Sequence, residues 1–332
     1  SKAMSDCSLK STGTIIVLLI VDIVFKFGCK ITNTKPIFNH FDYYMYKSSE
    51  LILDKNNHLY HINLGPEHID EYVFFVGDPH RVGEVSKFFD KIEFKRSHRE
   101  FVTHGGTYKG NRVMVISTGI GTDNIDIVLN ELDAAVNIDL DKRIPKESHR
   151  CLKIVRMGTS GSLQEDIDVD SFVTSVFAVG TDGLMNFYKT NPSKTAIELQ
   201  NTFIESTRYL DHFGRPYVGE ASSKLVNLLG EKSHLGITVT APGFYAPQGR
   251  ILRYELAESD LIERYANCRF ESYRVTNFEM ETAGIYGLGN LLGHEVCSIS
   301  AIVANRVKGN FSTNSQKTVD ALIDYTLTSI LK

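Results

Sequence analysis

Short apolar segments rich in β-branched and aromatic residues recur along this chain, and helical patterns separate them. Three of these segments, each ending in a glycine-bearing turn, are predicted strands: Tyr72–Val76, Val113–Ser117 and Leu152–Val155. Residues 124–136 carry apolar side chains at three- and four-residue spacing, which predicts an amphipathic helix capped by Thr122 or Asp123. Strands that alternate with helices are typical of an α/β domain, in which ligands bind at strand ends.

The remaining elements follow the same alternation. Further strands are predicted at Phe172–Val179 and Gly236–Ala241, and helices at Ile197–Tyr209, Ala283–Gly289 and Val319–Leu331. The charged segment 139–150 contains a proline and is predicted to be a surface loop. Because the chain shows no repeat, low-complexity tract or clear linker, we expect one domain over residues 45–332 rather than two.

Residues 1–44 differ from the rest of the chain. The apolar run from Thr14 to Phe25, interrupted by Asp22, is too short to span a bilayer. A signal peptide has the same order of charged and apolar residues, yet residues 26–30 offer no convincing small-x-small cleavage site. We therefore expect a poorly ordered N-terminal extension over residues 1–44, natural or derived from expression, with secretion as the alternative.

The overall charge argues against two classes of partner. Of the 332 residues, 42% are hydrophobic and 23% are charged, as in globular proteins, and the formal net charge is -4. Without a general basic field, neither nucleic acid nor an anionic membrane is an expected partner.

The five cysteines form no CxxC pair and are odd in number, which argues against a disulfide framework or a zinc site. A cytoplasmic, reducing environment is the expected location.

Two carboxylates stand in an otherwise apolar stretch. Glu279 and Glu281 flank Met280 in the segment 274–282, and a nearly uncharged run follows. Burying an isolated carboxylate is costly unless it finds a partner. An ionised carboxylate only accepts hydrogen bonds, so a pair of sugar hydroxyls would suit it. The alternative is a helix N-terminus, where the macrodipole favours acidic residues; this stretch alone does not separate the two.

Two arginines follow predicted strands. Arg81 closes the segment 77–81, in which Gly77 leaves room for a ligand close to the backbone. Arg156 ends the strand over 152–155 and precedes a predicted Gly-Thr-Ser-Gly turn, whose amides and hydroxyls could surround an anion. Guanidinium groups suit phosphate. The alternatives are a purely structural Gly-Asp-Pro turn and an internal salt bridge of Arg156.

The segment 244–250 has the features of a site for a flat ligand, with aromatic side chains followed by Gln248 and Arg250. In an extended segment these two side chains would share one face, and their donors and acceptor match the edge of a pyrimidine dione. A surface loop is the alternative. A dinucleotide site has little support, because Asn124 replaces the final glycine of the fingerprint that begins in the turn 117–121.

Six motifs, in order, resemble the nucleoside phosphorylase superfamily of the hexamer type, and its uridine phosphorylase family most closely. They are Gly-Asp-Pro-x-Arg at 77–81, Ser-His-Arg-Glu-Phe at 97–101, Ser-Thr-Gly-Ile-Gly at 117–121, Arg-x-Gly-Thr-Ser-Gly at 156–161, Phe-Tyr-x-x-Gln-x-Arg at 244–250 and Asn-Phe-Glu-Met-Glu at 277–281. The similarity runs from about His61 to the C-terminus, and Met45 resembles the start of a typical member. It implies a three-layer α/β/α sandwich around a mixed, barrel-like sheet. It also implies a homo-oligomer, at least a dimer, with a hexamer as the other option.

The resemblance assigns roles residue by residue. The implied phosphate-binding residues are Gly77, Arg81, Arg156 and Thr159, joined by Arg99 from a neighbouring subunit. The implied ribose-binding residues are Met280 and Glu281, joined by His61 from the neighbour. The implied base-binding residues are Phe244, Gln248 and Arg250, and Arg250, Gln248 and Glu281 are the implied catalytic residues. Glu100, Ile120 and Asn124 match a monovalent-cation site between subunits, although relatives have serine at position 124; no other cofactor is implied.

The implied activity is reversible phosphorolysis of uridine to uracil and ribose 1-phosphate, a pentosyl transfer of pyrimidine salvage. Inorganic phosphate would be the co-substrate, and deoxyuridine and thymidine remain open as substrates. Purine nucleoside phosphorylases and nucleosidases of the superfamily are one alternative, but they carry Ser-Asp where residues 302–306 of this chain hold no aspartate. A non-catalytic nucleoside-binding protein is the other. It predicts damage to the phosphate arginines or to the Glu-Met-Glu run, and the sequence shows none.

Overall fold

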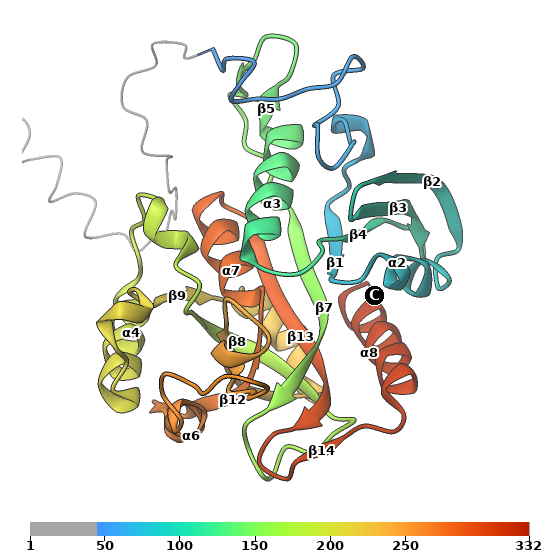
Figure 1. Cartoon of the computed structure of the whole chain (residues 1–332). Coiled ribbons are helices and arrows are strands. Elements are labelled where there is room, and N and C mark those ends of the chain that lie inside the picture. Colours follow the sequence, from blue (N-terminus) through green and yellow to red (C-terminus); the bar gives the residue numbers. More distant parts are fainter. Residues whose placement is uncertain (1–44, 332) are drawn as a thin grey trace, which may run out of the picture. The chain divides into compact units, whose positions relative to one another are not determined.

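A mixed β-sheet runs through the part of the chain that this computed structural model describes, residues 45–331 (Figure 1). Along its main path the strands follow the order β11-β12-β10-β8-β13-β7-β1-β4-β3-β2, while β14 pairs with β13 and β9 with β8. The strands are β1 (Tyr72–Val76), β2 (Lys91–His98), β3 (Phe101–Tyr108), β4 (Asn111–Ser117), β7 (Lys153–Ser162), β8 (Phe172–Gly180), β9 (Tyr217–Glu220), β10 (His234–Thr240), β11 (Arg269–Phe270), β12 (Tyr273–Glu279), β13 (Glu295–Asn305) and β14 (Asn310–Phe311). A separate hairpin joins β5 (Ile138–Asp139) to β6 (Ile144–Pro145).

One extra pairing closes part of this sheet. The end of β7 pairs antiparallel with β12, at Ser162 with Asn277 and Gly161 with Phe278. Because β7 also pairs with β13, the strands β7, β13, β8, β10 and β12 form a closed circuit. This confirms the predicted α/β fold with a mixed, barrel-like sheet.

Helices cover the sheet because the strand side chains alternate between two cores. Val73 and Phe75 of β1 lie in the core beneath α3 (Thr122–Asn137) and α7 (Thr282–Leu291). Phe74 and Val76 lie in the core formed with α2, α5 and α8. The other helices are α2 (Pro79–Ser86), α4 (Lys194–Thr207), α5 (Ser223–Leu229), α6 (Leu261–Asn267) and α8 (Ser315–Ile330). A third core joins α4 and α6 to β8, β10 and β12. Short 3₁₀ turns occupy Pro66–His68, Leu184–Phe187, Asp211–Phe213, Gly230–Lys232 and Ala246–Gln248.

The predicted strands and helices are present, with ends that differ by a few residues. The largest error concerns β7, because residues 158–161 were predicted as a turn and lie inside this strand. Arg156 therefore does not end its strand. Pairing with β13 over ten positions, together with the contact to β12, outweighs the local preference of the two glycines for a turn.

The predicted cap of α3 is also wrong. Gly121 occupies the N-cap position with a φ of 95°, and neither Thr122 nor Asp123 caps the helix. Glycine suits this position because an L-residue at such a φ would be strained.

The chain from Met45 onward forms one compact unit. The predictions for residues 1–44 lie outside the described residues. Among residues 45–331, no helix has the length and apolar character needed to cross a bilayer.

Candidate active site

A buried ionic network joins β7 to the end of β12 and the start of α7. Arg156 Nη2 donates to Glu281 Oε2 and lies 3.3 Å from Glu279 Oε2. The side chains of Arg156 and Glu281 are each 6% exposed, and that of Glu279 is 3% exposed. Although burial opposes the charged form, the two carboxylates hold the pKa of Arg156 above its ordinary value.

The two carboxylates have different surroundings. Glu279 accepts hydrogen bonds from Thr240 Oγ1 at 2.7 Å and from the backbone N–H groups of Glu281 and Thr282 at the start of α7. Glu279 thus has a structural role at the N-terminus of α7, which was the alternative to ribose binding. Glu281 accepts one N–H from Gly121 at 2.8 Å and one from Arg156. Burial raises the pKa of Glu281 more than Arg156 lowers it, and the neighbouring Glu279 raises it further. Glu281 keeps lone pairs that a ligand could use, and Met280 beside it is half-buried.

Gly158 explains how Arg156 reaches this network. The two residues share one face of β7, and a Cβ atom on Gly158 would lie 1.8 Å from Arg156 Nη1. The glycine therefore lets the guanidinium fold back over the strand. Arg156 Nη1 is buried and, within the described residues, has no hydrogen-bond partner.

A second buried guanidinium lies close by. Arg81 in α2 has a buried Nε with no hydrogen-bond partner among residues 45–331, and this Nε is 3.9 Å from Glu84 Oε2. Burial and the positive charge of Arg156 lower the pKa of Arg81 despite Glu84. Neighbouring guanidinium groups that each keep a buried, unpaired donor beside their carboxylate partners have the chemistry that suits an anion.

The other predicted phosphate residues lie along the same strands. Parallel pairing sets Phe75 of β1 beside Arg156, so Gly77 lies two residues beyond this pair at the strand end. The Gly77 carbonyl accepts the N–H of Gly119 at 3.1 Å. Thr159 is half-buried in β7, three residues after Arg156.

Arg250 and Gln248 meet, but not in the way the sequence suggested. The segment is a 3₁₀ turn over Ala246–Gln248 followed by Gly249 at a φ of 66°, not an extended strand. Arg250 Nη1 nonetheless donates to Gln248 Oε1 at 2.7 Å and to the Phe244 carbonyl at 2.6 Å. The centre of its guanidinium lies 3.7 Å from the centre of the Phe244 ring.

Arg306 belongs to this end of the site and was missed as a functional residue. Its Nη1 donates to the Gln248 carbonyl at 3.0 Å. The guanidinium groups of Arg250 and Arg306 lie 5.8 and 5.4 Å from the Phe278 ring. Burial and then the charge of Arg306 lower the pKa of Arg250. Because Phe278 directly precedes Glu279, β12 connects the arginine pair to the ionic network. The sequence could have indicated Arg306 as a functional residue, because it directly follows β13 and an arginine at a strand end favours an anionic ligand.

Among the described residues, neither His61 nor Arg99 forms a hydrogen bond or ion pair with this network. Arg99 is exposed in the turn between β2 and β3 at a φ of 53°, with its guanidinium 5.9 Å from the Tyr60 ring. His61 hydrogen-bonds to Glu131 in α3. Their contribution to the site of a neighbouring subunit stays a prediction.

The three residues of the predicted cation site come together around Gly119. A Cβ on Gly119 would lie 2.4 Å from Asn124 Nδ2 and 3.1 Å from Glu100 Cγ. Asn124 Nδ2 lies 3.4 Å from the Ile120 carbonyl oxygen. Glu100 and Ile120 supply oxygen atoms of the kind that cations bind, whereas the Asn124 amide donates to one of them. The residues therefore fit a monovalent ion in part, and its binding stays a prediction.

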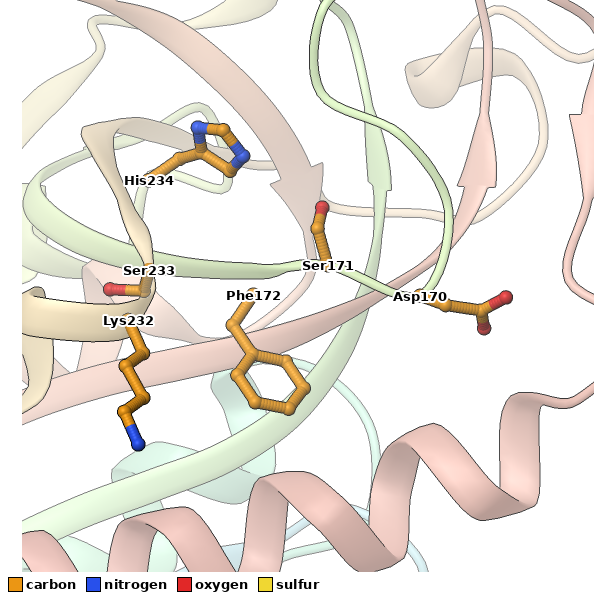
Figure 2. Close-up of a pocket in the computed structure, with 6 residues that line it drawn as sticks. All are labelled: Asp170, Ser171, Phe172, Lys232, Ser233 and His234. Atoms are coloured by element: carbon orange, nitrogen blue, oxygen red, sulfur yellow. The ribbon is translucent and has the colours of Figure 1, made fainter.

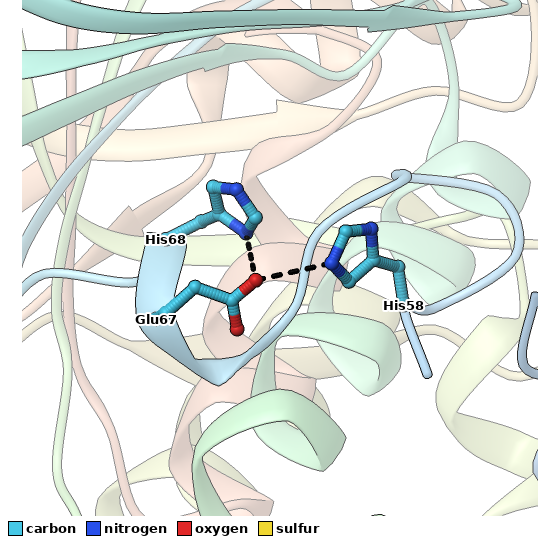
Figure 3. A group of neighbouring side chains, drawn as sticks. All are labelled: His58, Glu67 and His68. Carbon is cyan, nitrogen blue, oxygen red and sulfur yellow. Dashed lines mark hydrogen bonds and ion pairs between the residues drawn. The ribbon is translucent and has the colours of Figure 1, made fainter. Parts of the chain in front are cut away.

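A separate group of side chains, His58, Glu67 and His68, has the composition of a metal site (Figure 3). Glu67 Oε1 lies 3.0 Å from His58 Nε2 and 3.1 Å from His68 Nδ1. Metal-bound histidines normally donate their second ring N–H to an acceptor. His68 Nε2 instead faces the always-protonated Arg96 at 3.1 Å. The backbone N–H of Gly65 also donates to His68 Nδ1 at 3.0 Å, so both ring nitrogens of His68 have protein partners and the group suits a hydrogen-bonded cluster better than a metal ion.

A pocket of about 400 Å³ lies away from this site. Figure 2 shows the six residues that line it. Its lining comes from the beginnings of β8 and β10, namely Asp170, Ser171, Phe172, Lys232, Ser233 and His234. The ionic network contacts the other end of β10, at Thr240. The pocket is therefore separated from the network by the length of these strands.

Comparison with known proteins places the chain in a family. Residues 71–330 match the model of the phosphorylase superfamily. A uridine phosphorylase of Thermococcus kodakarensis is 31% identical over 258 residues, which cover 78% of this chain and 81% of the relative. A DeoD-type purine nucleoside phosphorylase of Colwellia psychrerythraea is 26% identical, with coverage of 82% and 98%. A solved structure, a Trypanosoma brucei nucleoside phosphorylase described as showing uridine phosphorylase activity, superposes with a TM-score of 0.76 at 29% identity; the match covers 84% of this chain and 99% of that one. With its closed mixed sheet and this similarity over most of its length, the chain belongs to the phosphorylase superfamily.

Proposed function

We propose that this protein is a uridine phosphorylase, which transfers the ribosyl group of uridine to inorganic phosphate. The observation that carries the proposal is the pair of buried, unpaired guanidinium donors, Arg156 Nη1 and Arg81 Nε. A hydrolytic nucleosidase needs no anion there, whereas a phosphorylase must hold its nucleophile beside the sugar. The choice of uridine as the nucleoside rests on the similarity to proteins named as uridine phosphorylases or described as having that activity.

Phosphate would bind between Arg81 and Arg156, against the backbone at Gly77 and the Thr159 hydroxyl. The anion would accept hydrogen bonds from Arg156 Nη1 and Arg81 Nε, the two buried donors that have no partner among residues 45–331. Binding in this low-dielectric position strengthens the attraction, because less water screens it.

Ribose would bind at Glu281 and Met280. The Glu281 carboxylate is fixed by Gly121 and Arg156, so its remaining lone pairs are oriented before the sugar arrives. Phosphorolysis passes through an oxocarbenium-like transition state, similar to that of glycoside hydrolysis. The negative charge of Glu281 favours the positive charge that develops on the sugar.

The base would bind at Gln248, Arg250 and Phe244, with Arg306 as an added cation. When the glycosidic bond breaks, negative charge moves onto uracil. Arg250 and Gln248 would stabilise this charge, as oxyanion-hole donors do, and such a donor typically contributes about 3 kcal/mol to the transition state.

Asn305 weakens the case for a purine substrate. The alternative enzymes carry an aspartate in the stretch that corresponds to residues 302–306. Here the Asn305 side chain is buried and fully used: Nδ2 donates to the carbonyls of Gln164 and Ile167, and Oδ1 accepts two backbone N–H groups. No carboxylic acid is available at this position to protonate a purine ring.

We also propose a cytoplasmic homo-oligomer that needs no organic cofactor, with phosphate as the co-substrate and a monovalent cation at Glu100, Ile120 and Asn124 as a further prediction. The free thiols of Cys151, Cys268 and Cys297 support a reducing compartment. His61 and Arg99 make no hydrogen bond or ion pair with the ionic network within residues 45–331, which supports a site completed by a second copy.

A base panel tests the substrate class. The protein is incubated with phosphate and either uridine, thymidine, deoxyuridine or inosine, and the released base is quantified by chromatography. Release of uracil at least a hundredfold faster than hypoxanthine supports the proposal. Comparable or faster release of hypoxanthine would overturn it in favour of a purine enzyme.

A further inference from the structure

Glu131, in the middle of α3, holds the His61 loop by three separate hydrogen bonds. Its carboxylate accepts the backbone N–H of His61 at 3.0 Å and that of Ile62 at 2.9 Å. The same carboxylate lies 2.6 Å from His61 Nδ1. The Glu131 and His61 side chains are 14% and 26% exposed, so the contact is largely shielded from water.

These contacts decide which ring nitrogen of His61 carries the proton. An ionised carboxylate can only accept, so His61 Nδ1 must be the N–H that donates to Glu131. In the neutral imidazole, Nε2 is then a hydrogen-bond acceptor. Within the described residues, Nε2 has no partner, although the rest of the ring is fixed. Tyr60 packs edge-on at 5.0 Å between ring centres, and His98 Nδ1 binds the His61 carbonyl at 3.1 Å.

The same helix separates His61 from the Glu281 network of its own chain. Gly121, which binds Glu281, precedes α3, and Glu131 lies ten residues later. At 1.5 Å per residue, this corresponds to about 15 Å along the helix axis. His61 is therefore too far along α3 to reach a ribose held by Glu281 of the same chain. Its side chain is 26% exposed, and Nε2, which has no partner among residues 45–331, can serve a second copy.

We propose that Glu131 is a positioning residue, which sets the tautomer and direction of His61 so that Nε2 accepts a hydrogen bond from a ribose hydroxyl in the neighbouring copy. This inference rests on the proposed function, because the nucleoside is its ligand. Glu131 would not touch the substrate. It would act on substrate affinity through His61.

Substitutions of Glu131 test the inference by kinetics. Glu131→Gln keeps an oxygen that accepts the backbone N–H groups but removes the charge that binds the imidazole. We expect KM for uridine to rise roughly tenfold with a change in kcat of less than threefold, the loss expected for one charge-assisted hydrogen bond. Glu131→Asp, which keeps the charge but shortens the side chain, should give a similar rise. Asp126→Asn is the matched control, since it neutralises another hydrogen-bonded carboxylate of α3 and should leave KM unchanged.

A double-mutant comparison separates positioning from a general structural role. If Glu131 acts through His61, the KM of the double variant E131Q/H61A should equal that of H61A. Full additivity of the two effects, or a KM for E131Q within twofold of the wild type, would overturn the inference.

Histidine NMR supplies a readout that does not depend on turnover. With ¹⁵N-labelled histidine and H61A for assignment, the free wild-type protein should show the Nδ1–H tautomer of His61, and E131Q should show a mixture. An unchanged tautomer in E131Q would contradict the role of Glu131 even if the enzyme were active. Failure of the wild type to cleave uridine would instead contradict the proposed function, so the two failures are distinguishable.

Discussion

Arg156 and Glu281 form a buried ion pair between β7 and the start of α7, 125 positions apart in the chain. The pair leaves Arg156 Nη1 without a partner in the described part of the chain, and it leaves lone pairs on Glu281. Phosphate and ribose would therefore bind to the two members of one fixed pair. This arrangement would place the nucleophile next to the sugar that it attacks.

Replacing Arg156 by lysine keeps the positive charge but removes the planar fork. Lysine cannot hold Glu281 and a phosphate oxygen at fixed angles simultaneously. We expect kcat/KM for phosphate to fall at least a hundredfold. Steady-state kinetics with varied phosphate measure this, and Arg112→Lys is the control, since Arg112 pairs with Asp70 away from the network and is 56% exposed. An R156K enzyme with wild-type phosphate kinetics would exclude Arg156 from the phosphate site.

A methyl group on Gly158 tests the path of the Arg156 side chain. The new Cβ of Gly158→Ala would overlap Arg156 Nη1, so the guanidinium must shift. Gly161→Ala on the same strand is a matched control, because its Cβ would make only ordinary contacts, the nearest at 3.5 Å from Phe278. We expect G158A to raise KM for phosphate more than tenfold, with little change for G161A. Equal effects of the two variants would mean that strand disruption, not arginine placement, is measured.

Arg250→Ala should damage catalysis far more than folding. The side chain is half-buried, so its loss should change the free energy of unfolding by about 1 kcal/mol or less. If Arg250 stabilises the leaving base, kcat/KM for uridine should fall roughly a hundredfold. Chemical denaturation and kinetics on the same preparation give both numbers, with the exposed Arg253→Ala as control. A loss of activity that merely follows the loss of stability would refute this role.

Uridine binding should weaken at acidic pH. Burial raises the pKa of Glu281, so this carboxylate takes up a proton at a higher pH than an exposed glutamate would. The protonated form loses its charge and part of its capacity to accept hydrogen bonds from ribose. The Kd for uridine, measured by calorimetry, should rise as the pH falls through this raised pKa. The measurement is made without phosphate, because phosphate would itself titrate. A Kd that stays constant until the ordinary glutamate range would contradict the assignment.

The sequence predicted those parts of the fold and site that depend on local patterns. Apolar β-rich runs gave β1 and β4, and the three-four spacing gave α3. The course of β7 through Gly158 and Gly161 could not be predicted in the same way, because strands far away in the sequence decide it. Glutamate in an amphipathic helix usually faces water, so nothing in the sequence pointed to Glu131 as the residue that holds His61.

The central claim is that phosphate, not water, cleaves uridine, and phosphate dependence measures this most directly. The protein is freed of phosphate, incubated with uridine with and without inorganic phosphate, and assayed for uracil and ribose 1-phosphate. We expect both products in equal amounts, and only when phosphate is present. Uracil and free ribose without phosphate would contradict the account and identify a hydrolytic nucleosidase. No uracil under either condition would equally contradict it and favour a nucleoside-binding protein.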